Sequence, residues 1–238
     1  IAAVNEAFNV NEADSILALS ELSFDLSVYD IFGLLIAGGT IVYPQQSDSK
    51  EPQAWLRLIK RHQVTLWNTV PQLAGLLADE PGADISTIRV YLLSGDWIPV
   101  SLPDKLKQLS ANTQVISLGG ATEGSIWSIW YPIESVDPRA SSIPYGYAMP
   151  NQKMYVLNEG GQHCPVGVMG EIHIGGMGVA VNYWGNEDIT AKQFFHHPKL
   201  GRLYKTGDLG RWHHNGYIEF CGRADFQVKI NGYRVELE

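Results

Sequence analysis

The first 132 residues alternate between short apolar runs and longer segments with helical periodicity. A strand followed repeatedly by a helix favours parallel βαβ units. We therefore predict an α/β fold, in which a parallel sheet carries helices on both faces. The expected strands are 15–20, 40–43, 64–67, 89–93 and 114–117, and the expected helices are 28–37, 52–62, 71–78 and 102–109.

The pattern changes after Pro132. Residues 133–150 are rich in Pro, Ser and Gly and are typical of a loop. Short alternating strands are predicted beyond it, interrupted by one helix at 187–195. The expected strands are 153–157, 171–174, 217–220 and 227–230. This pattern predicts a small, mostly antiparallel β subdomain.

Charge and hydropathy exclude several classes of protein. A formal net charge of −8 argues against binding a nucleic-acid backbone, which requires a basic face. No apolar run approaches the roughly 18 residues that a membrane-spanning helix needs. The first residues shown are not basic, so we expect no signal peptide, and the two cysteines, Cys164 and Cys221, are far apart, as in reduced thiols. We predict a cytoplasmic protein without nucleic-acid or membrane partners.

A glycine-rich stretch, Leu118–Trp127, follows the strand expected at 114–117. Glycine allows the backbone to approach a ligand closely. Thr122 and Glu123 then place a hydroxyl and a carboxylate at the carboxyl end of the strand, where open α/β sheets bind ligands. This pair suits Mg²⁺ that carries a nucleotide phosphate. A purely structural Gly-Gly turn is the alternative.

Other polar groups also fall at expected strand ends or turns, and each has a structural alternative. Asp25 is placed to cap the helix at 28–37. Gly207 and Asp208 have ordinary turn chemistry. Arg223 and Asp225 could form an exposed ion pair of little energetic value.

The order of these groups carries a family resemblance. Gly170–Ala180 is followed by Tyr204–Leu209 and then by Gly222–Leu237. This series resembles the later core motifs of adenylate-forming (ANL superfamily) enzymes, specifically the adenylation domains of nonribosomal peptide synthetases. The resemblance covers nearly the whole chain.

The resemblance implies a role for each matching residue. Thr122 and Glu123 would handle the phosphates of ATP, with Mg²⁺ held by Glu123 through the nucleotide. Asp208 would accept both ribose hydroxyls, and Arg223 would reach the ribose–phosphate region. Asp225 would be the hinge of the C-terminal subdomain. The residues expected to line the adenine are Gly95, Gly119, Gly120 and Ala121.

The family resemblance also implies a division of the chain into three parts. Residues 1–132 would bind substrate and adenine, 133–223 would form the β-rich part with the ribose motif, and 224–238 would hold the hinge and the start of the next subdomain. The phosphate loop is expected before Ile1 and the catalytic lysine beyond Glu238. We therefore expect this chain to be the later part of the family's large N-terminal region. We also expect this part alone to adenylate poorly.

The chain departs from the family pattern at three positions. Gly119 and Ala121 stand where an aromatic residue and a proline are usual, so this loop lacks an aromatic platform for adenine. Asn231 stands where an arginine is usual, which puts the closure of the C-terminal subdomain in doubt.

The resemblance also assigns an amino-acid pocket. Asp25 would pair with the substrate's α-ammonium group. The other members are small or apolar, edged by the Asn68 amide and the hydroxyls of Tyr29 and Ser94. The combination resembles that of cysteine-activating modules that build thiazoline or thiazole rings, whereas physics leaves Cys, Ser, Ala and Val open. The pocket residues are Asp25, Leu26, Tyr29, Asn68, Leu92, Ser94, Leu118, Ile126 and Trp127.

The predicted activity is ATP-dependent adenylation of L-cysteine, followed by thioester formation on the phosphopantetheine of a peptidyl carrier domain. Other synthetase domains are expected partners, including an inserted oxidase domain of the kind that related cysteine modules carry. One alternative is an acyl- or aryl-CoA ligase, whose substrate would not need Asp25. Another is a non-catalytic scaffold half that docks a tailoring domain, which nucleotide affinity would distinguish.

Overall fold

The computed structural model describes residues 1–137, 139–224, 227–230 and 233–236. The hinge candidate Asp225 and the departure at Asn231 lie outside these described residues. Internal contacts divide the chain into two units. The first holds residues 1–117 and 132–143, and the second holds 118–131 and 144–224. The three-part division implied by the resemblance stays a prediction.

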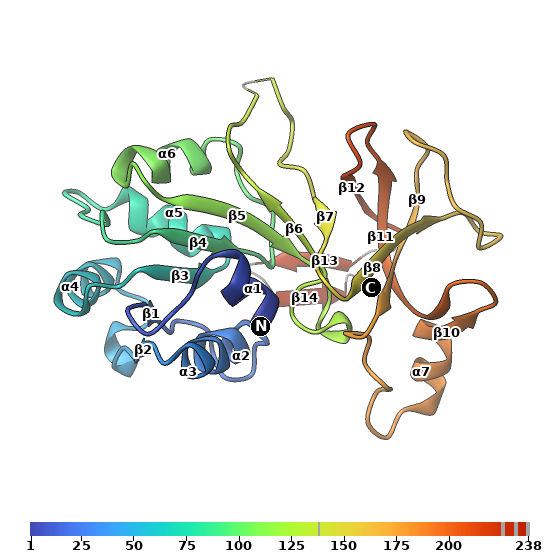
Figure 1. Ribbon diagram of the computed structural model, residues 1–238, viewed down its shortest axis with the longest axis horizontal. Coiled ribbons are helices and arrows are strands. Elements are labelled where there is room, and N and C mark those ends of the chain that lie inside the picture. Colours follow the sequence, from blue (N-terminus) through green and yellow to red (C-terminus); the bar gives the residue numbers. More distant parts are fainter. Residues whose placement is uncertain (138, 225–226, 231–232, 237–238) are drawn as a thin grey trace. The chain divides into compact units, whose positions relative to one another are not determined.

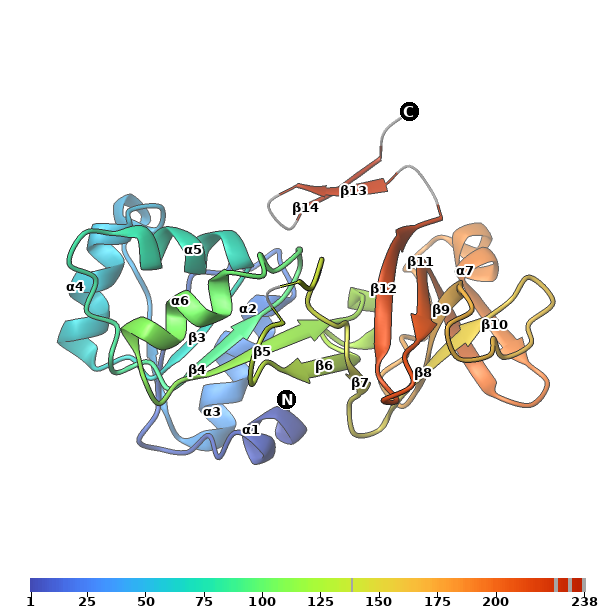
Figure 2. The same cartoon turned by 90° about the horizontal axis from the view of Figure 1, so that it is seen from above.

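The first unit is built on a parallel sheet, as predicted. Its strands follow the order β2-β1-β3-β4-β5 and pair in parallel. Helices α4, α5 and α6 cover one face, and α1 and α3 cover the other (Figure 2). Every residue of β1, β3 and β4 is buried, because each strand is covered on both faces. The strands are β1 (Ser15–Leu17), β2 (Thr40–Val42), β3 (Leu66–Thr69), β4 (Val90–Leu93) and β5 (Gln114–Gly119).

The helices of this unit agree closely with the periodicity. The fully buried Trp55 and Ile59 lie on one face of α4, whose bounds match the prediction. The helix predicted at 28–37 contains a π-helical turn, where the buried Tyr29 ring packs over Gly33. The helices are α1 (Ala2–Ala7), α2 (Leu26–Val28), η1 (Tyr29–Gly33), α3 (Leu34–Ala37), η2 (Gln46–Asp48), α4 (Pro52–His62), α5 (Pro71–Asp79) and α6 (Leu102–Leu109).

The second unit is mainly antiparallel, also as predicted (Figure 1). The order β10-β11-β9-β8 forms its larger sheet, with β12 paired to β11, while β6 pairs with β7. Its core includes Ile129, Val156, Ile172 and Ile218. The elements are η3 (Thr122–Gly124), β6 (Ile129–Pro132), β7 (Tyr147–Ala148), β8 (Gln152–Leu157), β9 (Gly170–Gly176), α7 (Glu187–Gln193), β10 (Phe194–His197), β11 (Gly201–Trp212) and β12 (Ile218–Arg223). Beyond it come β13 (Gln227–Ile230) and β14 (Tyr233–Glu236).

Two local predictions are wrong. The helix expected at 187–195 ends at Gln193, because Phe194 and Phe195 begin β10 and pair with β11. The turn that we considered at Gly207 and Asp208 is an irregularity inside β11, a strand that the sequence did not reveal. None of the described helices is long and apolar enough to cross a membrane.

A charged cluster ties together the amino-terminal ends of three strands. Asp14, Thr65 and Arg89 each directly precede a strand: β1, β3 and β4. Arg89 donates from Nε and Nη2 to the two oxygens of Asp14, at 2.8 and 2.7 Å. Thr65 donates to Asp14 Oδ1 at 2.7 Å. Burial alone would raise the pKa of Asp14, but these hydrogen bonds outweigh it and hold that pKa below its usual value.

We expect Arg89→Met to lower the free energy of unfolding by about 3–5 kcal/mol at pH 7, because it leaves the Asp14 carboxylate buried without its cation. The loss should shrink as the pH falls below the ordinary pKa of an aspartate, where the carboxylate takes up a proton. Urea unfolding at several pH values measures both effects. The control is Arg139→Met, whose partner Asp137 is exposed and which should cost no more than about 1 kcal/mol. Equal losses in the two variants would contradict the prediction.

Candidate functional site

The glycine-rich loop at the end of β5 is tightly held within the second unit. Gly119 O accepts from Ser128 N at 2.8 Å, and Ala121 O accepts from Gly124 N at 2.7 Å. Gly120 has a φ of 144°, and a side chain there would meet the Ser128 backbone. The loop therefore presents Gly119, Gly120 and Ala121 on one fixed backbone.

Glu123 is oriented by residues that sequence reasoning did not identify. Tyr183 donates from its hydroxyl to Glu123 Oε1 at 2.5 Å, and Ala180 N donates to Glu123 O at 2.8 Å. Burial, together with hydrogen bonds involving Glu123 and Tyr204, raises the pKa of Tyr183 above its usual value. Tyr183 therefore stays protonated and acts as a donor. The glycine-rich segment after β9 was the available signal for this contact.

Thr122 and Glu123 fit a magnesium ion that arrives with a nucleotide. Within the described residues, no group of three or more His, Cys, Asp or Glu side chains could hold a metal by itself. Mg²⁺ does not need such a cage, because it commonly combines one or two carboxylates with phosphate oxygens and water. Glu123 would hold the ion, which would neutralise phosphate charge.

Asp208 lies in a bulge that interrupts β11. The pairs Lys205↔His173 and Leu209↔Glu171 show that the segment between them is longer on β11 than on β9. Gly207 has a φ of 74°, and its N donates to Glu171 Oε1 at 3.0 Å. Thr206 Oγ1 in turn accepts from Asp208 N at 3.0 Å. The backbone N–H groups of Gly207 and Asp208 are thus satisfied within the protein.

Asp208 and Arg223 form an ion pair between β11 and β12. Arg223 Nη1 lies 2.7 Å from Asp208 Oδ1, and their side chains are 14% and 10% exposed. The two residues are direct neighbours in the strand register. Arg223 therefore has a shielded partner in Asp208. Asp225, the partner considered from the sequence, lies outside the described residues. The Asp208–Arg223 pair places a carboxylate acceptor directly beside the several N–H donors of a guanidinium group.

Two of the predicted amino-acid residues of the first unit, Leu26 and Leu92, are neighbours of Asn68. Asn68 and Leu92 are register partners on β3 and β4. Asn68 Nδ2 donates to Leu26 O at 3.1 Å. Ser94, just beyond β4, is 3% exposed, and Gly95 after it has a φ of 84°. The Asp25 side chain makes no capping hydrogen bond, so capping does not explain it.

One member of the predicted pocket is used differently from expectation. The Tyr29 hydroxyl, expected at the edge of the pocket, donates to Asn5 Oδ1 at 3.0 Å in the interior. Asn5 Nδ2 donates in turn to Gly33 O at 2.8 Å. Tyr29 thereby connects α1 to the π-helical turn, and its hydroxyl is engaged with α1.

Asp30 is a buried acid that the sequence analysis missed. It accepts a hydrogen bond from Asn68 Nδ2 at 2.7 Å and is fully buried. Burial raises the pKa of Asp30 to about 7, against the opposing effect of hydrogen bonds from Asn68 and Ser20. Both amide hydrogens of Asn68 are therefore committed to Leu26 and Asp30. Asn68 Oδ1 is a buried acceptor without a hydrogen-bond partner among the described residues.

The remaining pocket candidates belong to the second unit. Leu118 and Trp127 are each 4% exposed. Ser125 and Ile126 have φ angles of 69° and 65°, in the left-handed region that a β-branched residue rarely adopts. Ser125 Oγ holds this turn by donating to Gly178 O at 2.7 Å. Such strain is common at binding sites. The other candidates, from Asp25 to Gly95, belong to the first unit.

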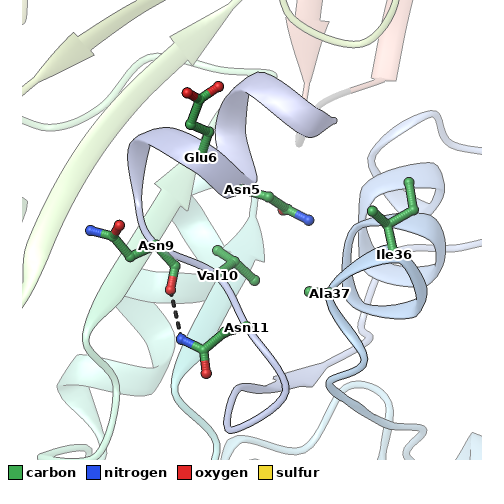
Figure 3. Close-up of a pocket in the computed structure, with 7 residues that line it drawn as sticks. All are labelled: Asn5, Glu6, Asn9, Val10, Asn11, Ile36 and Ala37. Carbon is green, nitrogen blue, oxygen red and sulfur yellow. Dashed lines mark hydrogen bonds between the residues drawn. The ribbon is translucent and has the colours of Figure 1, made fainter.

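A pocket elsewhere in the first unit is lined by none of the predicted site residues. One of its lining residues, Asn5, accepts a hydrogen bond from the hydroxyl of Tyr29. The pocket lies between α1, the turn after it and the end of α3 (Figure 3). Asn11 Nδ2 donates to Asn9 O across its floor. Glu6 is the one charged residue of its lining, so the pocket offers no paired groups for catalysis.

The chain is similar to known proteins over most of its length. A family model described as AMP-binding enzyme matches residues 1–184. Bacitracin synthase 1 of Bacillus licheniformis is 50% identical over 98% of this chain, which spans 4% of that protein. Pyochelin synthetase PchF of Pseudomonas aeruginosa is 48% identical over 98% of this chain, which spans 13% of it. The chain is thus a small part of the length of these relatives.

Solved structures are similar over nearly the whole chain. The nonribosomal peptide synthetase FmoA3 with α-methyl-L-serine-AMP bound superposes with a TM-score of 0.91 at 39% identity, over 95% of this chain and 26% of that one. PA1221, which contains adenylation and PCP domains, has a TM-score of 0.89 at 28% identity, over 95% of this chain and 40% of that one.

The buried Asp30 predicts a pH dependence of stability. Its pKa is raised in the folded protein, so the folded state holds a proton that the unfolded state releases at lower pH. The free energy of unfolding should therefore fall between about pH 4 and 7, by up to about 1.4 kcal/mol per pH unit. Asp30→Asn should remove this fall and keep an acceptor for Asn68. Unfolding by urea from pH 4 to 8 measures it, with Glu12→Gln, which removes an exposed carboxylate, as control. An unchanged profile in Asp30→Asn would contradict the assignment.

Proposed function

We propose that this chain, which belongs to the AMP-binding enzyme family, forms the part of an amino-acid adenylation domain that holds the amino acid and the adenosine of ATP. The reaction joins the amino-acid carboxylate to the α-phosphorus of ATP and releases pyrophosphate. No covalent nucleophile is required, since positioning and charge stabilisation supply the catalysis. Mg²⁺ bound with the nucleotide would neutralise phosphate charge near Glu123.

The observation that carries the proposal is the shielded Asp208–Arg223 pair. An ionised carboxylate can accept hydrogen bonds from two neighbouring ribose hydroxyls. Arg223 lies at 2.7 Å on one side of it, fixes its orientation and adds positive charge for a phosphate. Thr206 and Asp208 are buried, so the interruption of the ladder is not an exposed turn. The bulge supports a site, because bulges re-aim side chains next to active sites.

L-Cysteine is the proposed amino acid. The Asn68 amide has both hydrogens committed, so its oxygen is left to accept from a substrate. A thiol or hydroxyl can donate to it, whereas the side chains of Ala and Val cannot. The thiol is preferred because the pocket residues resemble those of cysteine-activating modules. PchF is named as a pyochelin synthetase, and FmoA3 holds the adenylate of a small amino acid.

A carrier domain is the proposed acceptor of the activated amino acid. PA1221 contains a PCP domain beside its adenylation domain, and other relatives are synthetases far longer than this chain. The thiol of the carrier's phosphopantetheine would attack the acyl-adenylate and release AMP. Asp225, the proposed hinge, lies outside the described residues.

Amino-acid-dependent ATP–pyrophosphate exchange by the full-length protein tests the proposal. We expect exchange with cysteine, weaker exchange with serine, and little with alanine or valine. Asp208→Asn should raise the KM for ATP about 10-fold or more, because it weakens charge-assisted hydrogen bonds to the ribose. The control is Glu219→Gln on the same strand pair, which removes a carboxylate from the exposed pair with Arg211. No exchange with any amino acid, together with no ATP binding, would favour the scaffold alternative.

Asp25 separates an amino-acid substrate from a plain carboxylic acid. We expect Asp25→Asn to lower kcat/KM for cysteine about 100-fold, because the α-ammonium loses its charged partner. The KM for ATP should change little. The control is Glu21→Gln, an exposed carboxylate just before α2. Undiminished exchange with cysteine, or preferred exchange with an acid that lacks an amino group, would favour the CoA-ligase alternative.

A further inference from the structure

Tyr145 occupies the space beside the glycine-rich loop where a side chain of residue 119 would lie. It belongs to the segment between β6 and β7 of the second unit. A Cβ atom added to Gly119 would lie within 2.9 Å of three carbons of the Tyr145 ring. Such contacts are too close for any side chain, so Gly119 and the Tyr145 ring are matched to one another. An aromatic ring from the segment between β6 and β7 thus lies directly beside the glycine-rich loop.

Several contacts hold the Tyr145 ring in this place. The backbone of Gly120 hydrogen-bonds its hydroxyl, and the ring of Phe220 on β12 lies 5.7 Å away. The ring also packs on the hydrophobic core of the second unit. Burial raises the pKa of Tyr145 above its usual value, and the charge of Asp208 adds to this effect. The hydroxyl therefore stays neutral.

The position of the ring connects the two parts of the candidate nucleotide site. Gly120 belongs to the glycine-rich loop, whereas Asp208 and Arg223 form the ion pair of β11 and β12. Tyr145 is hydrogen-bonded to Gly120, and it lies close enough to Asp208 and Arg223 for their charges to affect its pKa. Tyr145 as a residue also keeps part of its surface exposed. An aromatic ring at such a point can pack on a nucleobase, because every base has an apolar π-face.

We propose that Tyr145 supplies the aromatic surface on which the adenine of ATP packs, in place of a side chain from the glycine-rich loop. The inference rests on the proposed function of the same site. It assigns a binding role to a residue outside the loop and explains why position 119 is glycine. A ring that only filled space in the core would stabilise the fold without any preference for the base.

Equilibrium binding to the full-length protein tests the proposal, with ATP and inorganic tripolyphosphate as the probes. Tyr145→Leu keeps apolar bulk and removes the flat ring. We expect it to weaken ATP binding about 10-fold or more and to leave tripolyphosphate binding unchanged, because stacking acts on the base alone. Tyr145→Phe restores the ring and should recover most of the lost affinity. In turnover, Tyr145→Leu should raise the KM for ATP and leave the KM for cysteine unchanged.

Equal weakening of ATP and tripolyphosphate binding by Tyr145→Leu would overturn the proposal in favour of a structural role, and so would unchanged binding of both. If Tyr145→Leu does not fold by circular dichroism, Tyr145→Met takes its place, since methionine adapts to irregular gaps. Failure of the unaltered protein to bind ATP would instead overturn the proposed function. The two failures are therefore distinguishable.

Discussion

A strand that is paired on both sides can be interrupted only where the backbone groups released from its ladder find other hydrogen-bond partners. β11 pairs with β9, β10 and β12, and it is interrupted at Thr206–Asp208. Both backbone polar groups of Gly207 find other partners there: Gly207 N donates to the Glu171 side chain, and Gly207 O accepts from Ala224 N. The pairing of β11 with β12 then sets Asp208 opposite Arg223. The hydrogen bonds that hold the backbone of the bulge therefore also help to fix the position of the ion pair.

In the first unit, the two ends of the parallel strands differ in how completely their buried polar groups are hydrogen-bonded. At their amino-terminal ends, Asp14, Thr65 and Arg89 satisfy one another in a closed cluster. Toward the carboxyl ends, Asn68 and Asp30 leave two buried oxygens without partners among the described residues. Each such atom costs about 1–3 kcal/mol if nothing compensates it. The closed cluster suits a structural role, and the open one suits a group that completes its hydrogen bonds when a ligand is present.

The elements that the sequence predicted well are those whose signals are local. Pro52 and the helical spacing of Trp55 and Ile59 were sufficient for α4. The apolar runs of the parallel strands were also sufficient, because both faces of those strands are buried. β11 was missed because polar residues interrupt its alternation, so Thr206–Asp208 resembled a turn. Phe194 and Phe195 continue a helical pattern, and pairing with β11 overrides it.

Candidate site residues can be proposed from sequence where a motif lies within one segment, but contacts between distant segments cannot. Thr122, Glu123 and Asp208 were proposed from short motifs through the family resemblance, and their roles stay predictions. The contacts of Tyr183 with Glu123 and of Asp30 with Asn68 join residues far apart in the chain, and neither follows from periodicity.

Gly119 shows how the same residue changes its meaning with its surroundings. In sequence, a glycine after a strand indicates an open backbone that a ligand can approach. In the structure, that space is filled by the protein's own Tyr145 ring. The absence of an aromatic residue from the loop therefore does not imply the absence of an aromatic surface from the site. Where a glycine leaves space for the side chain of a neighbouring residue, that neighbour can also provide the binding surface that a side chain at the glycine position would provide.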